Sequence, residues 1–162
     1  MVLLVGAAAL VVGRFHARPA VAGHTPADPV TASAVQNGVQ VTVVVTADTV
    51  QATYRPQRPG FHLYSISLPT DGVDGLGIPT RLEVQGGLRA TGSPTSDRPV
   101  QSLNLPGLSA PLPVYPDGPV AITLPVTRTG STSAQVVVSY GACSTSTCLF
   151  PVRALVIPIR LG

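Results

Sequence analysis

The sequence lacks tryptophan and lysine, and it has few aromatic and few charged residues. Aromatic side chains make up 4% of its 162 residues, and charged side chains make up 10%. Ten arginines against seven acidic residues give a formal net charge of +3. The arginines are scattered singly, with no basic stripe and no interleaved aromatics. This pattern excludes the usual surface of a nucleic-acid-binding protein, and we expect no nucleic-acid partner.

Helical periodicity is also missing, since no window keeps a helical apolar pattern over three turns. What is present instead is proline (17 residues), glycine (16 residues) and much valine and threonine. This composition predicts an all-β chain with many turns. A hydrophobic fraction of 44% is enough for a core, and the length suits one ordinary domain better than two.

Several segments alternate apolar and polar residues with the period of a half-buried strand. The clearest runs from Val39 to Val45, with valine at every second position on one face. Further strand-like segments are GFHLYSISLP (60–69), TRLEVQG (80–86), PVAITLPVTRTG (119–130), SAQVVVSYGA (133–142) and CLFPVRALVIPIRL (148–161). Seven or so short strands separated by turns predict an immunoglobulin-like β-sandwich. Pro125, Pro151 and Pro158 within these segments predict edge strands or bulges at those points.

The N-terminus has the features of an export signal. Its apolar run, MVLLVGAAALVV, is too short for a transmembrane helix but suits the hydrophobic region of a signal peptide. The sequence AVA at residues 20–22 offers a cleavage site before Gly23. We therefore expect residues 1–30 to be a signal peptide or N-terminal membrane anchor plus linker, and residues 31–162 to be the folded domain. The protein is expected to be exported, in the periplasm or elsewhere outside the cytoplasm, where a disulfide can persist.

The chain has only two cysteines, Cys143 and Cys148, within the stretch YGACSTSTCLFP (140–151). Two strands meeting around the residues STST would place these cysteines opposite each other, about 4.5 Å apart at Cα, within the range of a disulfide. Closing a loop of about six residues stabilises a fold by only about 2 kcal/mol. On these grounds a redox-active disulfide and a structural staple are about equally supported.

A metal site fits the sequence less well. Two thiolates alone would leave a tetrahedral zinc site half empty, and the three histidines lie far from the cysteines in sequence. A copper(I) site would need further cysteine or methionine, and the only methionine is Met1. We expect no metal and no other cofactor.

Three residues have both a structural and a functional interpretation. Tyr140 could enclose the sulfurs, but a tyrosine at a strand end more often packs in a core with its hydroxyl bonded. Phe150 could screen the disulfide or fill the edge of the sandwich. His62, with apolar neighbours at period-two spacing, is interpreted as structural rather than as a general base.

The cysteine stretch resembles the active-site hairpin of the N-terminal domain of the DsbD family of thiol:disulfide interchange proteins. In that family a tyrosine stands three residues before the first cysteine, four or five residues separate the cysteines, and a proline follows three residues after the second. Tyr140, Cys143, Cys148 and Pro151 satisfy this pattern. GFHLY (60–64) and VYPDGPVAITLPV (114–126) are similar to two further family segments, in the same order along the chain.

The resemblance implies an immunoglobulin-like domain that relays electrons by thiol–disulfide exchange outside the cytoplasm. Its partners would be a membrane-embedded electron-transfer protein and thioredoxin-like proteins, both separate from this chain. By position, Cys148 corresponds to the cysteine that forms the mixed disulfide with a partner, and Cys143 to its internal partner. The family covers its cysteines with a loop bearing an aromatic residue. The equivalent stretch here, about 102–112, has none, and the leucines expected in its place are Leu103, Leu105 and Leu108.

The sequence thus leaves two functions of different class. The first is a thiol:disulfide oxidoreductase acting through Cys143 and Cys148, with Tyr140, Phe150, Leu105 and Leu108 as candidate shielding residues. The second is an exported, non-catalytic immunoglobulin-like binding or assembly module, in which the small disulfide only tightens a hairpin.

Overall fold

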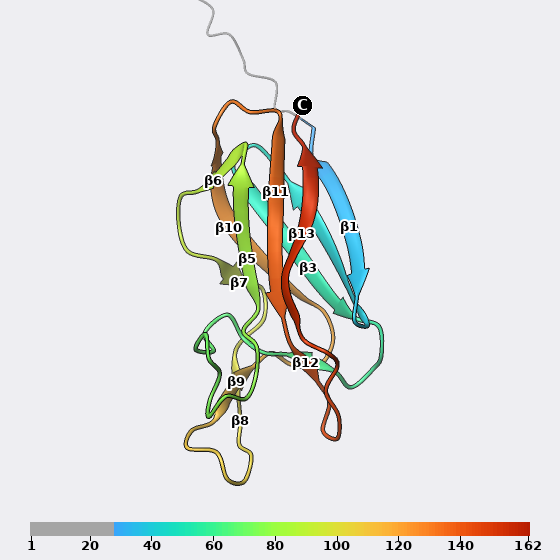
Figure 1. The fold of residues 1–162 in the computed structure, drawn as a ribbon, viewed down its shortest axis with the longest axis vertical. Helices are drawn as coiled ribbons and strands as arrows, with labels where there is room; N and C mark the ends of the chain where they lie inside the picture. The colour runs from blue at the N-terminus through green and yellow to red at the C-terminus, as the bar shows by residue number, and fades with distance from the viewer. Residues whose placement is uncertain (1–27) are drawn as a thin grey trace, which may run out of the picture.

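The computed structural model describes residues 28–162, and these residues form a β-sandwich (Figure 1). Thirteen strands and no helix occur in this part of the chain, so no helix there could cross a membrane. The prediction of an all-β fold is confirmed. The predicted signal or anchor segment lies almost wholly outside the described residues, and the first strand begins at Val30, next to the predicted start of the domain.

The larger sheet is antiparallel and is built mainly on long neighbouring strands. Its order is β1 (Val30–Gln36), β2 (Val39–Val45), β3 (Thr49–Pro56), β10 (Val120–Arg128) and β6 (Leu88–Ala90), and β7 (Thr95–Ser96) also pairs with β10. Asn37 and Gly38 join β1 to β2, with φ values of 50° and 76°. Two left-handed residues of this kind form the tight hairpin turn whose twist matches that of the strands, so this pair sets the register of β1 on β2.

The smaller sheet has the order β13 (Val152–Arg160), β11 (Ser133–Tyr140) and β5 (Arg81–Gly86). In Figure 1 it lies in front of the larger sheet, and the two inner faces share one core. The alternating valines of β2 are all fully buried there, as the period-two pattern predicts. They meet side chains such as Ile122 from the same sheet and Val136 and Ile157 from the other. We call this cluster the sandwich core.

A second group of strands forms one end of the molecule, at the bottom of Figure 1. These strands are only two or three residues long: β4 (His62–Leu63) pairs with β12 (Ala142–Cys143), and β8 (Gln101–Leu103) pairs with β9 (Leu112–Val114). A separate small cluster of buried residues lies here, which we call the end cluster: Tyr64, Leu68, Leu112, Val114 and Cys143.

Most of the predicted strands are found, but the segment 60–69 is an exception. A regular alternating strand was expected, whereas the structure has only the two residues of β4, followed by a turn in which Leu68 N donates to Ser65 O. The segment does not form a strand with one buried and one exposed face, because every residue from Phe61 to Ser65 is buried. β1 and β3 were not among the predicted segments, although β3 alternates clearly with Val50, Ala52 and Tyr54 inward.

Pro158 lies in an edge strand, as predicted, whereas Pro125 does not. Pro158 lies in β13, at the edge of the smaller sheet. Pro125 lies in β10, which is an inner strand. Pro125 is tolerated there because β7 pairs with the part of β10 before the proline and β6 with the part after it, and neither pairs with the proline itself. The Pro125 carbonyl oxygen accepts a hydrogen bond from Thr91 N, in the segment between β6 and β7.

Candidate functional site

Cys143 and Cys148 form a disulfide at the end of the molecule that holds the end cluster, with their Cα atoms 4.0 Å apart. Cys143 is the second residue of β12 and is buried, with 6% of its surface exposed. Cys148 pairs opposite it across the turn and is exposed. The two sulfurs therefore belong to residues with very different access to solvent.

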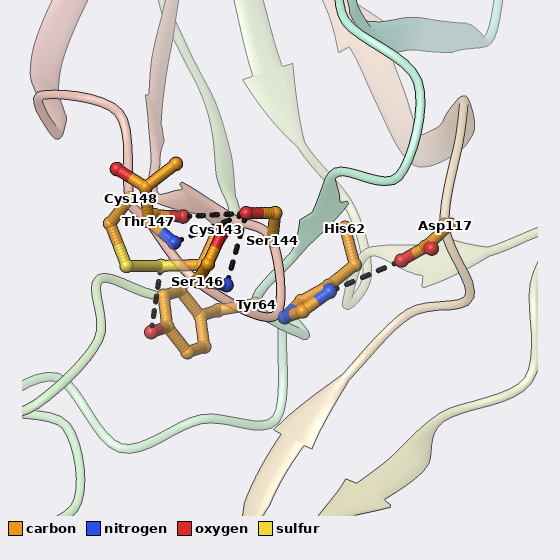
Figure 2. A network of polar contacts seen from close by, with 8 residues as sticks. All are labelled: His62, Tyr64, Asp117, Cys143, Ser144, Ser146, Thr147 and Cys148. Carbon is orange, nitrogen blue, oxygen red and sulfur yellow. Dashed lines mark hydrogen bonds and ion pairs between the residues drawn. A yellow bond between two sulfur atoms is a disulfide. The ribbon is translucent and has the colours of Figure 1, made fainter.

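The turn between the cysteines is closed by its own hydrogen bonds. Ser144 N donates to Thr147 O at 2.7 Å, and the amides of Ser146 and Thr147 donate to Ser144 Oγ (Figure 2). Leu149 N donates back to Ala142 O, which continues the pairing after Cys148. Small hydroxyl side chains favour turns of this kind because they can bond the nearby backbone.

Tyr64 contacts the buried sulfur. Its hydroxyl lies 3.2 Å from Cys143 Sγ, and because a disulfide sulfur has no hydrogen, the hydroxyl is the donor (Figure 2). The ring fits closely against two glycines: a Cβ on Gly141 would lie 3.0 Å from it, and one on Gly77 would lie 3.1 Å from it. Burial raises the pKa of Tyr64, so the hydroxyl keeps its proton at neutral pH.

His62 and Asp117 form a polar pair on the same side of the site. His62 Nδ1 lies 3.2 Å from Asp117 Oδ1; the histidine side chain is 10% exposed and that of the aspartate 60%. Two backbone bonds hold the residues around Asp117 beside β4, from Tyr115 N to Leu63 O and from Gly118 N to Phe61 O. On the other side of β4, His62 is the direct cross-strand partner of Cys143.

The disulfide borders a hollow of about 480 Å³. It is lined by the two cysteines and the turn between them, and by His62, Tyr64, Leu76, Leu103 and Leu105. Histidine is the only basic side chain among these lining residues, and none of them is acidic. A mostly apolar hollow with a few convergent polar groups is typical of a binding or reaction site.

Leu105 and Leu108, the two leucines that the resemblance suggested as shielding residues, lie at this end of the molecule. The β8–β9 hairpin brings Leu105 to the hollow, with 39% of its surface exposed, and Leu108 packs against the end cluster that contains Cys143. A hydrogen-bonded contact links this hairpin to the loop before Gly77: Ser109 N and Ser109 Oγ donate to the carboxylate of Asp74 at 2.7 and 2.9 Å. The Ser109 amide, and then its hydroxyl, lower the pKa of Asp74.

Tyr140 and Phe150 lie away from the disulfide hollow. Tyr140 belongs to the sandwich core, where its ring meets Tyr54 edge-on at 5.6 Å and its hydroxyl donates to Gln36 O at 2.9 Å. Burial raises the pKa of Tyr140 to about 12. Phe150 is 86% exposed and lines no hollow beside the sulfurs. Tyr140 therefore has the core role that the sequence favoured, and Phe150 neither screens the disulfide nor fills the sandwich edge.

Three residues at the site were not identified as functional from the sequence: Tyr64, His62 and Asp117. Tyr64 and His62 belong to GFHLY, so the resemblance of that segment was the available signal. Asp117 belongs to the other family-like segment, VYPDGPVAITLPV, but no local pattern links it to His62, which is 55 positions away in sequence.

Within residues 28–162, no three His, Cys, Asp or Glu side chains are grouped so that they could hold a metal ion. Comparisons with family models and with curated proteins find no match for this chain. The site therefore has to be interpreted from its own geometry. That geometry is a disulfide with one exposed and one buried cysteine, a phenol on the buried sulfur, and a histidine–aspartate pair beside it.

Proposed function

We propose that this protein carries electrons outside the cytoplasm by thiol–disulfide exchange through Cys143 and Cys148. One observation supports this above all: the disulfide joins an exposed cysteine to a buried one, next to a mostly apolar hollow. Exchange needs a sulfur that an incoming thiolate can approach and a second sulfur that departs as a thiolate. Cys148 is exposed to an incoming thiolate, whereas Cys143 is buried and suits the role of the departing sulfur.

The reaction starts with a partner protein that holds a reduced dithiol. One partner thiolate attacks Cys148 Sγ, a mixed disulfide forms, and the Cys143–Cys148 bond breaks with its electron pair going to Cys143 Sγ. The second partner thiolate then attacks the partner's own sulfur in the mixed disulfide and releases Cys148 as a thiolate. The partner is oxidised to a disulfide, this protein gains two electrons, and two protons convert its thiolates to thiols.

The reverse sequence passes the electrons on. The Cys148 thiolate attacks the disulfide of an oxidised acceptor, and the Cys143 thiolate then attacks Cys148 Sγ and releases the reduced acceptor. Cys143 is thus the resolving cysteine in this direction. The Tyr64 hydroxyl supports that role, because a donor 3.2 Å from the sulfur can bond to the thiolate that forms there.

The small structural value of the disulfide is consistent with reversible exchange. Closing a loop of about six residues contributes about 2 kcal/mol at most, and the turn is already ordered by the bonds to Ser144. A bond that the fold hardly needs can be opened and closed while the sandwich stays folded.

The surroundings suit a protein partner. Leu76 and Leu105 both line the hollow, and each has 39% of its surface exposed. Exposed large apolar side chains near one another are typical of protein–protein contact sites. We propose thioredoxin-like proteins as one partner and a membrane-embedded electron-transfer protein as the other. The sandwich would then be immunoglobulin-like and related to the N-terminal domain of the DsbD family, and the N-terminal apolar run would direct export.

The direct test is an equilibration of the oxidised protein with reduced thioredoxin and, separately, with glutathione buffers. The reaction is quenched with acid, and the thiol and disulfide forms are then separated and quantified. We expect rapid, reversible exchange. A disulfide that exchanges only slowly and stays oxidised in strongly reducing glutathione would support the alternative, an exported binding module with a structural hairpin disulfide.

A further inference from the structure

We propose that His62, oriented by Asp117, exchanges a proton with Cys143 when the disulfide opens. This inference rests on the proposed function, because it names the group that balances charge at the buried sulfur. The sequence favoured a structural role for His62, and two features of the fold point to the opposite interpretation. They are the position of the imidazole in the sheet and its unpaired nitrogen.

The first feature is a row of four residues across adjacent extended segments: Asp117, His62, Cys143 and Cys148. The backbone bonds on either side of Asp117 place its segment against β4. His62 and Cys143 are opposite each other in the β4–β12 pair, and Cys143 is opposite Cys148. Directly opposed residues in antiparallel strands have Cβ atoms about 4.5–5.5 Å apart on the same face. The row therefore places the imidazole and the buried sulfur on the same side of the β4–β12 pair.

The second feature is the state of the two ring nitrogens. His62 Nδ1 faces the Asp117 carboxylate, which accepts a hydrogen bond, so the neutral ring has its proton on Nδ1. Nε2 then has a free lone pair. It is buried and has no hydrogen-bond partner among the described residues, and in Figure 2 it points away from Asp117, toward the disulfide side of the site. A buried acceptor without a partner costs free energy.

Reduction of the disulfide would give Nε2 a partner, the Cys143 sulfur opposite it in the strand pair. When a thiolate attacks Cys148, the departing Cys143 sulfur takes the electron pair and one negative charge. An imidazolium at His62, protonated on Nε2 from solvent, can bond this thiolate and then transfer its proton to give the thiol and the neutral ring. In the reverse reaction Nε2 accepts the Cys143 proton and leaves the thiolate ready to resolve the mixed disulfide. A neighbouring imidazolium is an established cause of a lowered cysteine pKa.

Few other groups could take this role. The elements that border the hollow with His62 or contact its ring are β12, the cysteine turn, the β8–β9 hairpin, the loop containing Leu76, and the segment of Asp117. Apart from the cysteines, the only titratable side chains that they and β4 bring to the hollow or to the ring are Tyr64 and Asp117. The Tyr64 ring lies 6.5 Å from the His62 ring, and its raised pKa keeps it neutral where imidazoles titrate.

The first arm of the test needs no partner protein. In a Cys148→Ser variant, Cys143 is a free thiol, and its pKa is measured from the ultraviolet absorbance of the thiolate against pH. Adding His62→Gln should raise the Cys143 pKa by about one unit or more, and adding Asp117→Asn should raise it by less. Arg153→Gln is the matched control, since Arg153 is exposed and lines no hollow beside the sulfurs; it should leave the pKa unchanged.

The second arm measures the rate at which dithiothreitol reduces the otherwise unchanged protein, over about pH 5 to 8. His62→Gln should slow the reaction about tenfold or more at neutral pH and change the shape of the pH–rate profile. Asp117→Asn is a mild change at a residue whose side chain is 60% exposed, so it keeps the test valid if His62→Gln does not fold.

The two proposals fail in different ways. An unchanged Cys143 pKa and an unchanged pH–rate profile in a folded His62 or Asp117 variant would overturn the role of His62, even if the protein exchanges readily with thioredoxin. Failure to exchange with any thioredoxin-like protein would overturn the proposed function. In that case the Cys143 pKa, measured in the Cys148→Ser variants with and without His62→Gln, would still show whether His62 and Cys143 exchange a proton.

Discussion

The sandwich core and the end cluster are built in different ways. The sandwich core lies mainly between strands of up to nine residues whose side chains alternate in and out, and Leu63 of β4 and Ala142 of β12 extend it toward the other end. The end cluster lies among strands of two or three residues. Hydrogen bonds from side chains to the backbone fix the course of the chain there: Thr80 Oγ1 donates to Tyr64 O at 2.6 Å, and Arg81 Nη1 donates to Ile66 O at 2.7 Å.

Most of the residues that stabilise the fold therefore lie apart from the residues of the candidate site. Apolar burial supplies most of the free energy of folding, and the sandwich core has most of the buried apolar residues. The cysteine pair, the hollow and the His62–Asp117 pair are all at the other end of the molecule. If the proposed function holds, the disulfide changes oxidation state at the end cluster while most of the sandwich core stays packed.

The largest expected effect is a truncation in the sandwich core. Ile122 is fully buried, so Ile122→Ala should lower the free energy of unfolding by about 2–5 kcal/mol through lost burial and the cavity left behind. Leu105→Ala, at the exposed rim of the hollow, should cost much less. Denaturant titrations measure both. Equal losses would show that the two regions do not divide stability as described.

The next effect concerns alkaline pH and again involves the sandwich core. Burial raises the pKa of Tyr140 to about 12 and that of Tyr54 well above its usual value. A folded-state pKa above the unfolded value favours the protonated, folded form. The stabilisation is therefore complete below about pH 10 and is lost as pH rises toward 12. Unfolding titrations between pH 8 and about 12 should show this loss, and Tyr140→Phe should reduce it. A flat profile would contradict the burial of these phenols.

Reduction of the disulfide should have a smaller effect on stability. The short loop limits the contribution of the Cys143–Cys148 bond to about 2 kcal/mol at most. Thermal melts with and without reductant should therefore give similar cooperative transitions, displaced by a few degrees. If reduction unfolded the protein at room temperature, the disulfide would be a structural staple and the separation of the two regions would be wrong.

The same contrast explains how far the sequence predicts the structure. Alternation from Val39 to Val45 predicts β2 because one face of that strand is buried and the other is not. The pattern fails at Phe61 to Ser65, because a short strand covered on both sides has no polar face.

The site itself depends on contacts that no local pattern encodes. Tyr140 is only three residues before Cys143, yet β11 directs it into the sandwich core. The tyrosine that touches the sulfur is Tyr64, 79 positions away in sequence. The candidate cysteines could thus be identified from the sequence, whereas the groups around them could be identified only from the fold.

The most direct test of the central claim compares two single-cysteine variants. Cys143→Ser leaves the exposed Cys148 free, and it should accumulate a mixed disulfide with a thioredoxin-like protein. Cys148→Ser leaves only the buried Cys143 and should trap much less. Non-reducing electrophoresis and mass spectrometry would quantify and locate the mixed disulfide. Preferential trapping through Cys148 is the predicted result. Equal trapping, or trapping mainly through Cys143, would contradict the assigned roles, and no trapping across a panel of such proteins would contradict the exchange function itself.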